Sequence, residues 1–167
     1  MNTSPSTPRP SQAAARAASE VIELLEVLWE RGRDATSSAP VSTSQLRVMY
    51  VVEREEGINL RSLGDVLGAG PSSVSRLCDR LEAVGFVRRE HSPLSRREIA
   101  LRLTAGGRAY LAELRERREE ALVAALADMS DEQRAALADG LSGFQRASEG
   151  LLPLGREVSR SRTARSA

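Results

Sequence analysis

The sequence is poor in the residues on which most catalytic and metal sites depend. It has one cysteine and one histidine, which excludes an internal disulfide and leaves too few ligands for a tetrahedral zinc site. Aromatic residues make up only 3% of the chain, so the core must be built from leucine, valine and alanine; the richness in alanine and leucine, with few β-branched residues, favours helix. No nucleophile–base pair, glycine-rich phosphate loop or placed pair of carboxylates is recognisable. We therefore expect neither an enzyme nor a bound cofactor or metal.

The sequence also lacks long apolar runs: its longest uninterrupted apolar run is far shorter than the ~20 residues that span a membrane. The start of the chain is rich in serine, threonine and proline and lacks the basic-then-apolar pattern of an export signal. Together with the single cysteine, these absences predict a cytoplasmic protein without a membrane partner.

The charge that is present is concentrated in one segment. The net charge is only +1, but residues 71–102 hold seven arginines and four acidic residues, a local charge of +3. The segments on either side, 20–70 and 103–150, are acidic. A positive block inside an acidic helical chain is typical of a focused anion-binding surface.

Apolar periodicity and capping residues predict a mainly helical chain with one small β-hairpin. Ser42 and Gln45 form a capping-box pattern, Asn59 and Thr104 are N-cap residues, and Pro71 suits the first turn of a helix. The predicted helices cover about 12–31, 42–56, 60–67, 71–84, 105–128 and 131–150, and the predicted strands cover 86–90 and 98–103. Residues 1–11 are expected to form a disordered tail and residues 153–167 a basic flexible tail.

A short helix, a three-residue break and a longer helix have the spacing of a helix-turn-helix, and a hairpin directly after them makes it the winged type. On a helical wheel, the apolar residues of the longer helix fall on one side: Val74, Leu77, Cys78 and Leu81. Small hydroxyl residues and arginines fall on the other: Ser72, Ser73, Ser75, Arg76 and Arg80. The second face suits the major groove of DNA, and Cys78 is interpreted as a small buried hydrophobe.

The hairpin supplies a second basic element. Its basic residues are Arg88, Arg89, His91, Arg96 and Arg97, and arginines at a hairpin tip can enter a narrow minor groove. We expect Arg61, near the start of the preceding short helix, to meet a phosphate. Either element alone could be an ordinary solvated face. Together they predict that double-stranded DNA is the partner.

The run NLRSLGDVLGAGPSSVSRLCDRLEAVGFVRRE, followed by SRREIALRLTAGGRAYL, resembles the multiple-antibiotic-resistance-regulator (MarR) family. The resemblance is close over residues 42–126 and loose beyond them. It implies a winged helix-turn-helix with N- and C-terminal dimerisation helices: one domain over 12–152, a DNA-binding lobe over 42–104, and dimerisation helices over 12–33 and 105–152. Apolar residues of the later helices would need a partner chain: Leu111, Leu114, Ala121, Leu122, Ala125, Leu126, Leu137, Leu141, Phe144, Leu151 and Leu152.

The resemblance also implies a function, that of a homodimeric, sequence-specific transcriptional regulator acting as a repressor on a pseudo-palindromic operator. A small aromatic or phenolic effector would bind near Trp29, Arg47, Tyr50 and Arg54. The chain departs from the family at Ser95, where an acidic residue usually orients the wing arginines; Glu98 or Asp79 is an alternative source of that carboxylate. A winged protein-interaction module and a nonspecific architectural DNA-binding protein remain open as alternatives.

Overall fold

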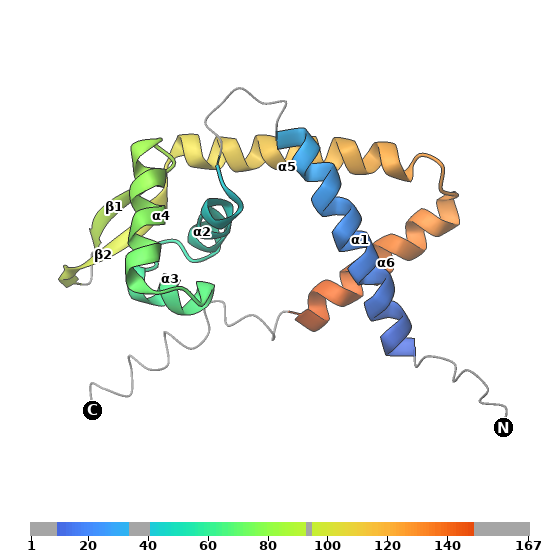
Figure 1. Ribbon diagram of the computed structural model, residues 1–167, viewed down its shortest axis with the longest axis horizontal. Helices are drawn as coiled ribbons and strands as arrows, with labels where there is room; N and C mark the ends of the chain where they lie inside the picture. Colours follow the sequence, from blue (N-terminus) through green and yellow to red (C-terminus); the bar gives the residue numbers. More distant parts are fainter. Residues whose placement is uncertain (1–9, 34–40, 93–94, 149–167) are drawn as a thin grey trace. The chain divides into compact units, whose positions relative to one another are not determined.

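The computed structural model describes residues 10–33, 41–92 and 95–148, and it divides the chain into two units, Met1–Pro40 and Val41–Ala167. The first unit contains helix α1 (Pro10–Arg33). The second contains α2 (Thr43–Arg54), α3 (Leu60–Leu67), α4 (Pro71–Ala83), β1 (Val87–Ser92), β2 (Ser95–Leu103), α5 (Ala105–Leu126) and α6 (Asp131–Ser148) (Figure 1). This order confirms the predicted winged helix-turn-helix, and the lobe expected over 42–104 lies wholly in the second unit. The tail predicted over 1–11 is too long by two residues, because Pro10 and Ser11 belong to the first turn of α1; residues 1–9, like the predicted tail 153–167, fall outside the described residues.

Local capping signals determine where the helices of the lobe begin. The Ser42 hydroxyl accepts a hydrogen bond from the Gln45 amide (3.3 Å), and the Gln45 side chain accepts one from the Ser42 amide (2.9 Å), which confirms the predicted capping box. The Asn59 side chain accepts a bond from the Ser62 amide (2.8 Å) at the start of α3. Gly68 ends α3 with a φ of 62°, a left-handed conformation that favours glycine.

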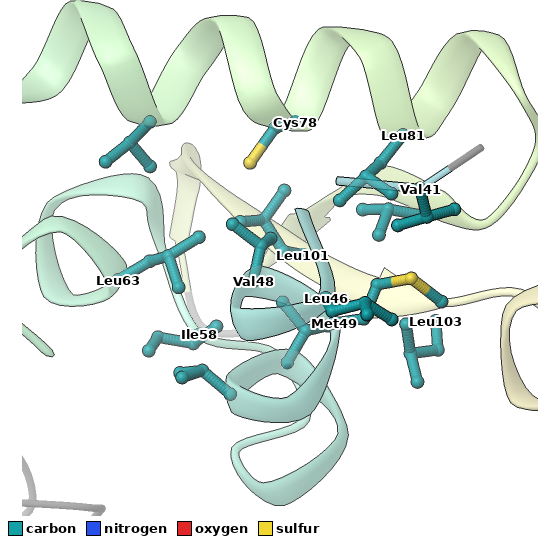
Figure 2. Close-up of a cluster of buried hydrophobic side chains, with 14 of the residues drawn as sticks. Val41, Leu46, Val48, Met49, Ile58, Leu63, Cys78, Leu81, Leu101 and Leu103 are labelled. Carbon is teal, nitrogen blue, oxygen red and sulfur yellow. The ribbon is translucent and has the colours of Figure 1, made fainter. Parts of the chain in front are cut away.

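The core of the lobe is aliphatic and gathers around α2 (Figure 2). Val48, Met49 and Val52 of this helix have no exposed surface, and α3, α4 and the hairpin pack around it. Cys78 and Leu81 project from α4 into the same cluster. Because α2 is buried on several sides, the interior fixes where α4 and the hairpin lie on the lobe.

The hairpin is longer than predicted and is joined to a third extended segment. Its strands pair antiparallel from Val87 opposite Leu103 out to Ser92 opposite Ser95. The Leu101 amide donates to the Ile58 carbonyl (2.9 Å), and an isolated bridge links Asn59 to Ala100. Ala100, whose strand neighbour across this bridge is Asn59, is only 4% exposed, although it alternates with the core residues Leu101 and Leu103.

Helix α5 begins in close contact with the turn that leads into β1. The Thr104 hydroxyl donates to the Gly85 carbonyl (2.6 Å) and accepts from the Gly107 amide (2.9 Å), so one side chain caps α5 and holds the turn. Phe86 stacks on Tyr110, with ring centroids 4.8 Å apart. The start of α5 is therefore fixed to the end of α4 and to the base of the hairpin.

The later part of the chain differs from the expectation in one respect. Leu111 is fully buried and Leu114 packs against the core of the lobe itself, so these two residues do not need a second chain. The unsatisfied apolar surface lies farther along, at Leu137, Leu141 and Phe144 of α6, which are 39%, 55% and 66% exposed. Leu151 and Leu152 fall outside the described residues.

Candidate nucleic-acid interface

Helix α4 has a buried apolar face and an exposed polar face, as its sequence predicts. Val74, Cys78 and Leu81 are at most 1% exposed and Leu77 packs against the core. On the other side, Ser75 is half-buried and the following are exposed: Ser72, Ser73, Arg76, Asp79 and Arg80. The face proposed to meet DNA is thus accessible along the length of the helix.

The first turn of α4 is open. Gly70 is its N-cap and makes no side-chain capping bond, and Pro71 supplies no amide proton. The Arg76 side chain folds back toward this end, where its Nε donates to the Ser72 carbonyl (3.3 Å). Two serine hydroxyls and an arginine at this helix start make a suitable surface for a phosphate or a base edge.

The two arginines of α4 differ from those of the wing in their partners. Among the described residues, neither Arg76 nor Arg80 forms an ion pair with a carboxylate. Arg88 on β1 pairs with Glu90 (3.0 Å). Arg102 on β2 bridges Glu90 (3.0 Å) and Glu56 (2.9 Å). The sequence analysis missed these pairs, because a count of arginines does not show which of them are neutralised.

Arg89, which the sequence analysis counted as a DNA contact, is engaged inside the lobe. One guanidinium nitrogen donates to Asp79 (2.6 Å) and another donates to Glu82 (2.8 Å), and the side chain is 26% exposed. The hydrogen bond with Asp79 raises the pKa of Arg89. A wing arginine is therefore held by a carboxylate, but the carboxylate comes from α4. Asp79 was one of the two sources considered for the acid missing at Ser95.

The remaining predicted contacts lie on the surface or outside the described side chains. Arg61 on α3 and His91 on β1 are exposed. Arg96 and Arg97 lie in β2 toward the tip of the hairpin, and the structure does not describe their side chains or that of Ser95. Their roles stay predictions.

Cys78 is inert in this setting. It is 1% exposed and lies in the apolar core, and burial raises the pKa of its thiol to about 11. A thiol of that pKa holds almost no thiolate at neutral pH and is a poor nucleophile. This confirms the interpretation of Cys78 as a small buried hydrophobe.

A polar cluster joins α2 to α5 beside the residues predicted for an effector. Arg115 forms a two-bonded ion pair with Glu53 and lies 6.0 Å from the centre of the Tyr50 ring, and Arg118 donates to the Tyr50 hydroxyl (2.7 Å). The pair with Arg115 lowers the pKa of the Glu53 carboxyl. Sequence reasoning missed both arginines, because they lie more than sixty positions from their partners.

Of the four predicted effector residues, three lie on α2: Arg47 and Arg54 are exposed and Tyr50 is half-buried. Trp29 belongs to α1 in the first unit. Within the described residues, no three histidine, cysteine or acidic side chains are placed to hold a metal ion. None of the helices in this part of the chain has the length and hydrophobicity needed to cross a membrane.

Comparison with known proteins agrees with this geometry. Residues 41–99 match the model of the MarR family. The chain is 31% identical over 109 residues to YfiV, an uncharacterized HTH-type transcriptional regulator of Bacillus subtilis, an alignment that covers 65% of this chain and 68% of the relative. The chain belongs to the MarR family. It is thus a DNA-binding transcriptional regulator with a winged-helix fold.

Solved structures extend the likeness beyond the lobe of this MarR-family regulator. The transcriptional regulator Tm0710 of Thermotoga maritima matches with a TM-score of 0.69 and 25% identity, over 83% of this chain and 95% of that one. FabT of Streptococcus pneumoniae, solved in complex with DNA, matches with a TM-score of 0.62 and 22% identity, over 84% and 99% of the two chains. At that identity, the likeness to FabT shows the fold alone.

Proposed function

We propose that this MarR-family protein is a repressor that binds a pseudo-palindromic operator as a homodimer, with one α4 helix in the major groove of each half-site. The observation that carries the proposal is the polar face of α4, where Arg76 and Arg80 are exposed and have no carboxylate partner among the described residues. FabT, which shares this fold, was solved in complex with DNA, and this supports DNA as the ligand. The protein acts by binding, without catalysis, in the cytoplasm.

The proposed contacts fall into three groups, to the major groove, to the minor groove and to the phosphates. Residues of the polar face of α4 reach the major groove: Ser72, Ser73, Ser75, Arg76 and Arg80. The small side chains let the helix end approach closely, and an arginine can bind the edge of a guanine with two hydrogen bonds. Arg96 and Arg97 enter the minor groove from the wing, while Arg61 and His91 meet phosphates.

Selection from a library of randomised DNA duplexes tests specific binding, with footprinting upstream of the protein's own gene as a second source of sites. On the selected duplex, Arg76→Ala should lose about 10- to 100-fold in affinity, the cost of one arginine–base contact, and accept more bases at one position. Arg117→Ala is the control, since Arg117 is an α5 residue paired with Glu113. A gel shift at matched salt measures both variants beside Arg97→Ala.

Each rival function has its own signature in this experiment. Unchanged affinity in both Arg76→Ala and Arg97→Ala would show that the assigned face is wrong. Equal binding to selected and unrelated duplexes would indicate a nonspecific architectural protein. Failure to bind any duplex at low salt would favour the alternative function, a protein-interaction module whose arginines pair with an acidic partner protein.

Two exposed apolar surfaces support the homodimer. On α1, Val21, Ile22, Leu24 and Val27 are each more than half exposed in the single chain. On α6, Leu141 and Phe144 are likewise more than half exposed. Large aliphatic and aromatic side chains in this number are rarely left in water, and in this family the terminal helices of two chains pack together.

We further propose that a small aromatic or phenolic effector binds beside α2, near Arg47, Tyr50 and Arg54. The supporting observation is the aromatic ring of Tyr50 flanked by the guanidinium groups of α5, a setting suited to an aromatic anion. A thermal-shift screen with phenol, benzoate and the hydroxybenzoates should raise the melting temperature by a few degrees at saturating ligand. The shift should shrink in Tyr50→Phe, and no shift with any compound would contradict the proposal.

A further inference from the structure

Helix α4, the recognition helix of the proposed DNA complex, carries two acidic side chains on the side that is proposed to meet DNA. Asp79 follows one turn after Ser75 on the polar face, and Glu82 lies one turn beyond it. Both carboxylates are about half exposed, at 54% and 42%. Because every DNA contact brings phosphates close to this face, an unneutralised carboxylate here would repel the ligand.

The charge of α4 by itself is zero. Between Pro71 and Ala83 the helix has two arginines, Arg76 and Arg80, and two acidic residues, Asp79 and Glu82. A helix of zero net charge adds little net attraction to the DNA backbone beyond the local contacts of its arginines. The cation that restores a positive recognition surface must come from another element.

Arg89 of β1 supplies that cation in a fixed geometry. Its two terminal nitrogens bind one carboxylate each, at 2.6 Å to Asp79 and 2.8 Å to Glu82. The planar fork of a guanidinium suits two acceptors held one helical turn apart. Val87, two positions earlier on the same face of the strand, is 2% exposed, so a buried anchor and an ion-paired anchor both hold β1 to α4.

We infer that Arg89 is a positioning residue for DNA binding, which neutralises Asp79 and Glu82 and holds the wing at a fixed angle to the recognition helix without touching the DNA itself. This rests on the proposed DNA-binding function. It replaces the expectation that Arg89 is a direct contact. It also assigns a role to both carboxylates, of which sequence reasoning had considered only Asp79, as a source of the acid missing at Ser95.

A double-mutant cycle separates this role from a direct contact. The probe is a labelled duplex of about 30 base pairs, long enough for two half-sites, selected with the wild-type full-length protein. Arg89→Gln leaves both carboxylates uncovered and should weaken binding about tenfold, within the range found for coupled neighbouring residues. In the background Asp79→Asn with Glu82→Gln, the same Arg89→Gln change should cost less than about twofold, because nothing remains to be neutralised or held.

Arg88→Gln is the matched control, since it removes the same charge from the adjacent residue of the same strand, where Arg88 pairs with Glu90. It should change affinity by less than about twofold. The salt dependence gives an independent readout: the slope of log affinity against log salt should fall by about one if Arg89 contacts a phosphate, and by much less if it does not. Thermal melts establish that each variant is folded, and Arg89→Lys, which keeps the charge and loses the fork, replaces Arg89→Gln if that variant does not fold.

The outcomes are distinct. A loss in Arg89→Gln that disappears in the doubly neutralised background supports the inference. An equal loss in both backgrounds, or no loss in either, overturns it while leaving the proposed function standing, because the wild-type protein still binds its duplex. If the wild-type protein selects no duplex at all, the proposed function fails and this inference fails with it.

Discussion

Gly107 lies where helix α5 comes closest to the backbone of the preceding turn. A Cβ atom at this position would lie 2.2 Å from the carbonyl oxygen of Phe86 and 3.0 Å from its carbon. That carbonyl cannot move freely, because it accepts a hydrogen bond from the Thr104 amide (3.0 Å). The pair Gly106-Gly107 in the sequence therefore serves helix packing at one of its two positions, and it is not part of a nucleotide-binding loop.

Gly107→Ala should destabilise the protein by about 1–3 kcal/mol, the usual cost of forcing an extra methyl group into a close-packed site. Gly106→Ala is the matched control, since a Cβ there would meet only ordinary contacts at 3.6 and 3.7 Å. That change should be neutral or stabilise by up to ~1 kcal/mol, because alanine is the better helix former. Urea unfolding of the two variants gives both values, and equal stability in the two would contradict the packing argument.

At the scale of elements, the parts that sequence predicted best are those determined by neighbouring residues. The capping box at Ser42, the cap at Asn59 and the start of α4 at Pro71 depend on residues within four positions of one another. The burial of Val74, Cys78 and Leu81 follows from helical periodicity alone. These local signals were sufficient to place the helix-turn-helix.

The parts that sequence could not predict depend on contacts between elements. Arg89 and Asp79 are ten positions apart, and their pairing requires the hairpin to turn back onto α4. The outer half of the hairpin was missed because its polar strands lie beyond the core, where apolar alternation is not needed. The pair of Glu53 with Arg115 joins two helices separated by the whole lobe in sequence.

The structure also distinguishes the arginines of the wing from one another. The sequence analysis counted them as one cationic group, whereas in the structure some of them are ion-paired. Arg89 and Arg102 form ion pairs with carboxylates outside the hairpin and hold it to the lobe, whereas Arg88 pairs with Glu90 of its own strand. The DNA-directed charge of the proposed function is thereby limited to Arg61 of α3, the arginines of α4 and the outer part of the wing, a smaller surface than the composition indicated.

At the scale of the whole molecule, the single chain leaves too much apolar surface in water. The exposed residues of α1 and of α6 have no counterpart in the compact core of the lobe, which is complete by Leu111 and Leu114. In the homodimer proposed above, a second copy of the chain covers this surface. The two α4 helices of such a dimer could then read two half-sites at once.

Phe144→Glu should weaken the dimer, because it places a charge in the centre of an apolar contact. In sedimentation velocity, the wild-type protein should have twice the 18.1 kDa mass of the chain at micromolar concentration, and the variant should move toward the single mass. Val84→Glu is the control, since Val84 is an exposed apolar residue at the end of α4 and lies on neither terminal helix. A wild-type protein that remains at the mass of one chain would contradict the homodimer.

Burial of Cys78 has a practical consequence for following the protein in solution. It is the one thiol of the chain, and it lies on the buried face of α4 with 1% of its surface exposed. An alkylating reagent can reach it only when α4 separates from α2 or the lobe unfolds. The rate of alkylation therefore reports how often α4 separates from the core of the lobe. Binding of DNA or of an effector would register as a slowing of that rate, with no label added to the protein.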